Sequence, residues 1–250
     1  MTSLLRDAGA LAGLPQDPRW AERTGSTNED LASLARAGAP HGSAVVAGQQ
    51  RGGRGRRGRR WENPPEGALL LSVLLRGPFP PARLTHLALS AAVATAEACG
   101  PDYRIKWPND VQRADGRKVA GVLAEVEFEA GQVAWAVVGV GLNLGAAPPD
   151  LPDAAGLGLF PLTDAVRAAR AVGLVAGLLR WGAAALEAPE VVVAAWSRRD
   201  ALRDRRVSVE GVEGIALGVD RDGALRLLTA EGERRVLAGD VSLISPAPGG

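Results

Sequence analysis

Cysteine, histidine and lysine are all scarce in this 250-residue sequence. The one cysteine, Cys99, excludes a disulfide bond within the chain, and together with two histidines it leaves too few ligands for a zinc cluster. No run of about 18 apolar residues is free of charges and helix breakers, so we expect no membrane-spanning segment. The start, MTSLLRDAGALAGLPQD, has no long apolar region and does not resemble a signal peptide. These scarcities favour a reducing, cytoplasmic setting.

Both lysines, Lys106 and Lys118, fall in the stretch RIKWPNDVQRADGRKVAGVL, although Lys and Arg together number 29. A composition biased toward arginine explains why lysine is rare, but not why the two lysines are clustered. A lysine ammonium is a compact point charge, whereas an arginine guanidinium is a planar fork. The cluster therefore indicates two positions at which a guanidinium would not serve.

The segment 51–60, RGGRGRRGRR, contains only arginine and glycine, and we name it the Arg/Gly loop. Its six arginines carry +6 in a chain of net charge +1, so the other residues sum to −5 (+1 − 6). Glycine lets backbone N–H groups approach an anion, and guanidinium groups donate to carboxylate or phosphate oxygens. We therefore expect an anion-binding loop that is mobile without its ligand. A nucleic-acid-binding tract or a solvated linker has a similar composition, but strand-like runs flank this segment on both sides.

The pattern of apolar residues and caps predicts an α+β domain over most of the chain, and 46% hydrophobic residues can supply its core. Ser26, Thr27 and Asn28 can cap a helix that ends near Gly38 and Pro40. Further helices are expected at 1–14, 81–99, 163–187 and 189–199, and strands at 19–24, 43–48, 68–75, 103–107, 118–128 and 132–143. Because strands and helices do not alternate strictly, a mixed sheet is favoured.

From about residue 203 the pattern changes to short apolar runs separated by turns such as Asp222-Gly223. Five such runs, RVSVEG, GIALGVD, ALRLLTA, RRVLAG and DVSLI, predict a small β-barrel. The expected organisation is therefore a large domain at 1–200 and a small barrel domain at 201–250.

Five short motifs occur in an order and approximate spacing that resemble the biotin protein ligases, from about residue 20 onward. They are Gly25-Ser26-Thr27-Asn28; Gln50 with Gly53-Arg54-Gly55-Arg56-Arg57-Gly58 and Trp61; Lys106-Trp107-Pro108-Asn109-Asp110; Lys118-Val119-Ala120-Gly121; and Gly139-Val140-Gly141-Leu142-Asn143. Two departures are small. Arg51 and Gly52 replace a small or hydroxyl residue and an alanine, and the stretch between Asp110 and Lys118 is one residue longer than in some members.

This resemblance implies a mixed-sheet catalytic domain of the class II synthetase type, flanked by helices, and a C-terminal SH3-like β-barrel. It also implies a two-step reaction. Biotin and ATP give biotinyl-5′-AMP and pyrophosphate, with Mg²⁺ as the usual metal of ATP chemistry. A lysine of a biotin carboxyl carrier protein domain then attacks the adenylate, forms an amide and releases AMP.

The bifunctional members of the family carry an N-terminal winged-helix domain that binds DNA. About twenty residues precede Ser26, which leaves no room for such a domain, so we expect neither repression nor specific DNA binding. A homodimer is compatible with the sequence.

The resemblance also assigns roles to individual residues. Lys118 is the expected cation between the biotin carboxylate and the α-phosphate, with Asp110 and Arg54 as the other catalytic residues and Asp110 as the Mg²⁺ candidate. Residues expected to bind biotin are Ser26, Thr27, Asn28, Gln50, Gly53, Arg54, Arg56, Trp107, Lys118, Gly121, Gly139 and Gly141. Residues expected to bind ATP are Arg54, Arg56, Arg57, Trp61, Lys106, Asn109, Lys118 and Asn143.

Simpler interpretations remain open for several of these residues. Ser26 and Thr27 can cap a helix, Trp107 can belong to the core, and Asn143 can end a strand. The nearest enzymatic alternative is a lipoate ligase or octanoyltransferase of the same fold. A nucleic-acid-binding protein that uses the Arg/Gly loop is the alternative from another class, but such tracts interleave aromatic residues, and here only Trp61 is near.

Overall fold

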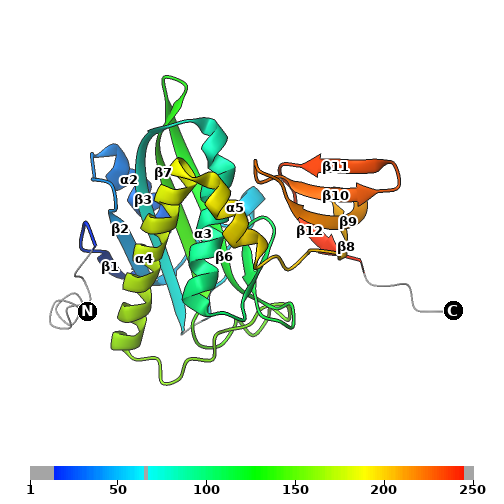
Figure 1. Cartoon of the computed structure of the whole chain (residues 1–250). Coiled ribbons are helices and arrows are strands. Elements are labelled where there is room, and N and C mark those ends of the chain that lie inside the picture. The colour runs from blue at the N-terminus through cyan, green and yellow to red at the C-terminus, as the bar shows by residue number, and fades with distance from the viewer. Residues whose placement is uncertain (1–13, 65–66, 245–250) are drawn as a thin grey trace.

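Two β-sheets organise the molecule, a computed structural model that describes residues 14–64 and 67–244 (Figure 1). A seven-stranded sheet with its helices forms the larger part, and a five-stranded sheet toward the C-terminus forms the smaller part. The helix expected at 1–14 lies outside the described residues, apart from Leu14.

The large sheet is mixed, so the α+β prediction is confirmed. Its strands are β1 (Arg19–Thr24), β2 (Ala44–Gln50), β3 (Ala68–Phe79), β4 (Arg104–Lys106), β5 (Asp110–Gln112), β6 (Lys118–Glu129) and β7 (Gln132–Asn143). They lie in the order β1-β2-β3-β7-β6-β5-β4, in which β1 and β2 are parallel and all other neighbours are antiparallel. β5 is not among the expected strands, because its three residues are too few for an apolar pattern to be read.

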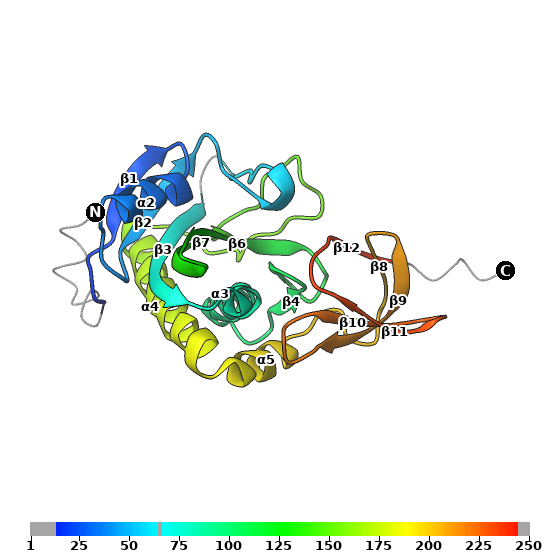
Figure 2. The same cartoon turned by 90° about the horizontal axis from the view of Figure 1, so that it is seen from above.

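Helices cover both faces of this sheet (Figure 2). They are α2 (Thr27–Arg36), α3 (Leu84–Cys99), α4 (Asp164–Glu187) and α5 (Pro189–Ser197), with single 3₁₀ turns η1 (Arg56–Gly58) and η2 (Pro81–Arg83). Leu31 of α2 shares an apolar cluster with Val45 and Leu74 on one face. Val46 and Val73 belong to the larger core cluster on the opposite face, beneath α3 and α4. Because both faces of β3 are covered, its apolar run is continuous rather than alternating.

Helix α4 is the one helix among the described residues whose length and apolar composition would let it cross a membrane. A core helix of a soluble protein has the same properties, and α4 packs along α3 and β3. Its arginines bond to neighbouring elements: Arg167 donates to the carbonyl of Ala68 at 2.6 Å, and Arg170 donates to that of Ala98 at 2.8 Å. These contacts explain α4 as part of the helical layer, and the absence of a membrane partner stays an expectation.

The small sheet consists of β8 (Arg206–Val209), β9 (Val212–Val219), β10 (Leu225–Thr229), β11 (Gly232–Val236) and β12 (Val241–Leu243). The strands pair antiparallel in the order β11-β10-β9-β8-β12, so the prediction of a second all-β domain is confirmed. Among the described residues no pairing joins β11 to β12, so closure into a barrel is not shown. Glu210 and Gly211 both have positive φ in the β8–β9 turn, as a tight hairpin requires.

The two parts contact each other directly. Trp107 Nε1 donates to the carbonyl of Gly223 at 3.2 Å, and His86 Nε2 lies 2.8 Å from the carbonyl oxygen of Arg221. Residues 85, 86 and 89 of α3 therefore pack against the β9–β10 turn. The expected domain boundary between residues 200 and 201 falls in the segment after α5 and stays a prediction.

Candidate active site

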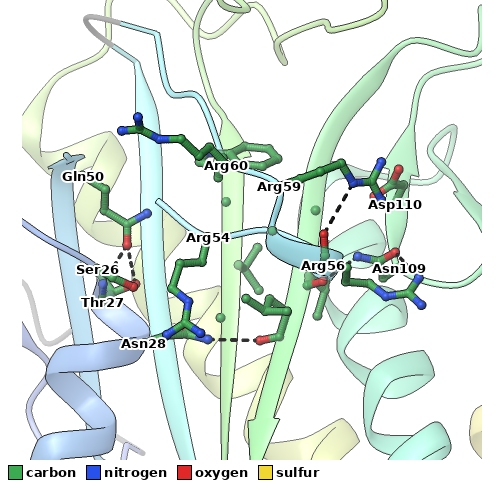
Figure 3. A pocket seen from close by; sticks show the side chains of 18 of the residues that line it. Ser26, Thr27, Asn28, Gln50, Arg54, Arg56, Arg59, Arg60, Asn109 and Asp110 are labelled. Carbon is green, nitrogen blue, oxygen red and sulfur yellow. Dashed lines mark hydrogen bonds between the residues drawn. The ribbon is translucent and has the colours of Figure 1, made fainter. Parts of the chain in front are cut away.

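The main candidate site is a pocket of about 180 Å³ on the α2 face of the large sheet, below the Arg/Gly loop. Figure 3 shows its two ends: Ser26, Thr27, Asn28 and Gln50 lie at one end, Asn109 and Asp110 lie near Arg56 at the other, and Arg54 lies between them. The strands β2, β6 and β7, the first turn of α2 and the loop thus converge on one cavity. Each of the five sequence motifs contributes at least one residue to its wall.

One end of the pocket is a buried polar cluster at the start of α2. The backbone N–H and the hydroxyl of Thr27 both donate to Gln50 Oε1, at 2.7 and 3.0 Å. The Ser72 hydroxyl donates to Asn28 Oδ1 at 2.6 Å and lies 2.8 Å from the Thr27 hydroxyl oxygen. Ser72 is not among the expected site residues. Its signal in the sequence is a single hydroxyl inside the apolar run ALLLSVLL, whose position relative to Asn28 only the fold reveals.

Glycines on β6 and β7 form the floor of the pocket. Gly121 and Gly141 are cross-strand partners, and a Cβ at Gly141 would lie 2.3 Å from the Trp61 ring. A Cβ at Gly139 would lie 2.0 Å from Asn28 Oδ1. Glycine is therefore required here for space, because side chains from α2 and the loop press against the strand backbone.

The other end of the pocket holds Lys118 and Asp110. The ammonium of Lys118 lies 2.6 Å from Asp110 Oδ1 and 5.4 Å from the centre of the Trp61 ring. Asn109 donates from Nδ2 to the carbonyl of Val122 at 2.6 Å, which fixes the turn that carries Asp110. The structure thus combines a compact cation with an aromatic face and a carboxylate.

The Arg/Gly loop is closed on itself and is held from several sides. Arg54 and Arg60 form an isolated antiparallel bridge, and the loop contains the turn η1. Arg54 forms ion pairs with Glu29 at 3.2 Å and with Glu125 at 2.8 Å. The sequence predicts a loop with little to pack; its partners are instead charged groups on distant elements. Its mobility without ligand stays a prediction.

Glu125 of β6 links the loop to the polar cluster. Its Oε1 accepts from Arg54, while its Oε2 accepts from Asn28 Nδ2 at 2.7 Å. Sequence reasoning missed this residue, because a glutamate in the run LAEVEFE looks like an ordinary solvent-facing strand residue. It carries the hydrogen-bond chain from the first turn of α2 to a loop arginine.

Arg56 reaches into the pocket from η1. Its Nη1 donates to Asn109 Oδ1 at 3.3 Å. Burial lowers the pKa of Arg56, and the nearby carboxylates of Asp240 and Asp110 act in the opposite direction. An incoming anion would therefore meet a partly desolvated guanidinium, in an environment where charge-assisted hydrogen bonds are strong.

A Mg²⁺ ion that accompanies ATP fits the oxygen donors at the Lys118–Asp110 end of the pocket. Asp110 is the carboxylate among the described residues that line the pocket. Mg²⁺ is commonly held by one or two carboxylates together with substrate phosphates and water, so one protein carboxylate suffices. Among the described residues no group of three or more His, Cys, Asp or Glu side chains could hold a metal without a substrate.

Trp107 lies elsewhere than the sequence suggests. It is 2% exposed and belongs to the core cluster on the α3 face, where its Nε1 bonds to the C-terminal sheet. The expectation that it lines the biotin pocket is therefore corrected. Trp107 packs the junction of the two parts because the β4–β5 turn directs its ring away from the α2 face.

Four other expected residues do not line the pocket either. Asn143 is buried and donates from Nδ2 to the carbonyl of Ala155 at 3.0 Å, which fixes the end of β7. Lys106 ends β4, and Arg57 is directed toward the C-terminal sheet. Gly53 is close-packed within the loop, since a Cβ there would lie 2.6 Å from the carbonyl oxygen of Trp61. Direct ligand contacts for these residues are not supported by the pocket geometry.

Two family descriptions match the chain. The Biotin/lipoate A/B protein ligase family matches residues 20–143, and the Biotin protein ligase C terminal domain matches residues 204–244. The first range ends at the last residue of β7, and the second contains all five strands of the small sheet.

Individual relatives agree with these matches. The bifunctional ligase/repressor BirA of Bacillus subtilis is 38% identical over 132 residues, which cover 51% of this chain and 40% of that protein. The match thus spans less than half the length of that relative. The biotin–[acetyl-CoA-carboxylase] ligase of Mycobacterium tuberculosis is 34% identical over 238 residues, covering 88% of this chain and 86% of that protein.

A solved structure extends the likeness to the whole fold. The biotin protein ligase of Aquifex aeolicus in complex with biotin and ATP superimposes with a TM-score of 0.75 at 27% identity. This superposition covers 92% of the present chain and 99% of the Aquifex chain. Because sequence and fold agree over both sheets, the chain belongs to the biotin protein ligase family.

Proposed function

We propose that this protein activates biotin with ATP to biotinyl-5′-AMP and transfers the biotinyl group to a lysine of a biotin carboxyl carrier protein domain. The observation that carries the proposal is the pocket itself. It joins a buried polar cluster, a compact cation beside a carboxylate, and an arginine-rich loop. The polar cluster suits the ureido ring of biotin, and the cation suits the reacting carboxylate and α-phosphate. The arginine-rich loop suits the phosphate chain of ATP.

The first step joins two anions, so positioning and charge neutralisation dominate it. A carboxylate oxygen of biotin attacks the α-phosphorus of ATP, and the bond from that phosphorus to the bridging oxygen breaks as pyrophosphate leaves. Lys118 supplies the ammonium between the two anions, with Asp110 holding it in place. A bound Mg²⁺ would neutralise phosphate charge as it builds on the leaving group. The Arg/Gly loop donates to the phosphates and keeps water from the mixed anhydride.

In the second step the acceptor amine attacks the carboxyl carbon of the adenylate. The bond from that carbon to the phosphate oxygen breaks, AMP leaves, and the proton of the amine passes to solvent water. Asp110 pairs with Lys118, and it is free to orient this amine once the adenylate has bound to the Lys118 ammonium. The carrier is proposed from the printed names of relatives that ligate biotin to acetyl-CoA carboxylase. A cytoplasmic location and a homodimer remain predictions.

Pyrophosphate release is the direct test of the first step. We expect release from ATP that depends on biotin and does not occur with lipoate or without an organic acid. Mass spectrometry should then detect biotinyl-5′-AMP bound to the protein. Release that lipoate supports and biotin does not would favour the lipoate alternative and refute the proposal.

We also predict that the chain does not bind operator DNA. In the described part of the chain, the element before α2 is the strand β1, which cannot act as a recognition helix. The Arg/Gly loop can still give weak, salt-sensitive attraction to phosphate backbones. Affinity measurements separate specific operator binding from this weak attraction. They compare specific and scrambled duplexes at low and physiological salt, with and without biotinyl-5′-AMP. Ligand-dependent, sequence-selective binding at physiological salt would contradict the prediction.

A further inference from the structure

The Arg/Gly loop is tied to the C-terminal sheet as well as to the pocket. Arg57 forms an ion pair with Glu210, and Arg59 forms one with Asp240 at 2.7 Å. A longer contact of 3.9 Å joins Arg57 to Asp240. Arg56 donates to the carbonyl of Gly239 at 3.4 Å. Three successive arginine side chains of one loop therefore end on two short segments of the other sheet.

The two acceptor segments support each other. Glu210 lies in the β8–β9 turn, and its Oε1 also accepts the backbone N–H of Asp240 at 3.1 Å. A Cβ at Gly239 would lie 2.7 Å from Val209 Cγ1, so the residues before β12 are packed against the end of β8. The hydrogen bond from Arg57 lowers the pKa of the Glu210 carboxyl, which keeps that carboxyl ionised. The loop thus meets an ordered pair of carboxylates.

The backbone of the loop makes a tight turn that directs Arg57 toward the small sheet. Arg57 has φ +58°, a left-handed conformation that a residue other than glycine adopts only when its surroundings enforce it. The loop has no apolar side chain that could supply this enforcement by packing. Backbone hydrogen bonds close the turn around Arg57, from the Gly55 N–H to the Arg59 carbonyl at 2.7 Å and from the Arg59 N–H to the Arg56 carbonyl at 3.2 Å. The ion pair to Glu210 then holds the side chain that this turn presents to the small sheet.

The same contacts lead directly to the pocket. The Arg56 guanidinium that donates to Gly239 also donates to Asn109, a residue of the pocket wall. The C-terminal sheet is itself fixed to the large part through Trp107 and His86, so its carboxylates lie at a set position relative to the pocket. A displacement of η1 away from the small sheet would therefore move Arg56 as well.

We propose that Glu210 and Asp240 are positioning residues, which hold the Arg/Gly loop over the pocket and so retain the acyl-adenylate until the acceptor arrives. Retention of the acyl-adenylate rests on the proposed function, whereas the ion pairs that hold the loop do not depend on it. Exposed ion pairs are individually weak and are weakened further by salt. A loop held by several of them can open for a macromolecular acceptor and close again, whereas a loop packed by apolar side chains would open rarely.

The double variant Glu210→Gln with Asp240→Asn tests this role. Backbone hydrogen exchange in the 51–60 segment of the ligand-free protein should become at least about fivefold faster, the scale expected when several weak ion pairs are lost together. Biotinyl-5′-AMP formed from biotin and ATP should also escape into solution several-fold faster. Glu233→Gln is the matched control. It removes a carboxylate that pairs with Arg226 at 2.6 Å within the same sheet, and it should change neither rate.

A charge reversal makes the test specific to the pair. Arg57→Glu alone should speed exchange in the loop, and adding Glu210→Arg should restore slow exchange. Thermal unfolding of each variant shows whether the fold is retained. Exchange in the double variant that matches the wild type would overturn the proposal. If the wild type made no biotinyl-5′-AMP, the proposed function would fail, while the exchange measurements would still decide whether these carboxylates hold the loop.

Discussion

Lys118→Arg is expected to lower the rate of biotinyl-5′-AMP formation by about 100-fold or more, the range seen when one preorganised charged or hydrogen-bonding group is lost from an active site. The positive charge remains, but its shape changes. The Lys118 ammonium fits between Asp110 at 2.6 Å and the Trp61 ring. A Cβ at Gly121 would lie only 3.0 Å from the same nitrogen, so the space around it is already narrow. A planar guanidinium cannot occupy that space without displacing one of these neighbours.

Pyrophosphate release and direct detection of biotinyl-5′-AMP measure this effect. Arg117→Lys is the matched control, because it also exchanges one cation for the other at the adjacent position. Arg117 pairs with Asp115 at 2.9 Å in an exposed turn outside the pocket, so its replacement should leave the rate unchanged. A Lys118→Arg protein that forms the adenylate at a rate close to that of the wild type would show that the role assigned to Lys118 is wrong.

Local patterns in the sequence predict most helices and strands, but they do not show which residues of distant elements contact each other. The strands with long apolar or alternating runs, such as β6 and β7, are found close to their expected bounds. Residues of the sequence motifs, such as Thr27, Gln50 and Lys118, line the pocket as expected. The resemblance to the biotin protein ligases places these residues in one site, because spacing and strand pattern alone do not show which strands are neighbours.

The missed features share one physical origin. Ser72 and Glu125 matter because of where β3 and β6 lie beside α2, and Glu210 matters because the small sheet meets η1. No local pattern contains this information. The misplacement of Trp107 has the same cause, since a buried tryptophan can face either layer of a sheet that is covered on both sides. Only the register and the crossing of elements decide between the two faces.

Gly139→Ala is expected to lower the affinity for biotin by at least about tenfold and the stability by about 1–3 kcal/mol, the cost of overpacking a tight interior. The added Cβ would lie 2.0 Å from Asn28 Oδ1, which accepts the hydrogen bond of the Ser72 hydroxyl. Asn28 cannot rotate away without losing that bond and its own donation to Glu125. The polar cluster is therefore lost as a unit, since a half-satisfied buried network is costly.

Denaturant unfolding and calorimetric titration with biotin measure the two effects separately. Gly173→Ala is the control. Nothing lies within 4 Å of a Cβ at this position of α4, so replacing a glycine inside a helix should raise stability by about 0.5–1 kcal/mol and leave biotin binding unchanged.

A second substitution separates the steric clash at residue 139 from the loss of hydrogen bonds in the polar cluster. Asn28→Ser in the Gly139→Ala protein shortens the side chain that the new Cβ meets, and it should recover part of the lost stability. Biotin binding should not recover, because serine cannot span the distance to Glu125 that the Asn28 amide now bridges at 2.7 Å. A Gly139→Ala protein with the stability and biotin affinity of the wild type would mean that the polar cluster is not the part of the pocket that recognises biotin. Recognition would then depend on the Lys118 end and on the loop.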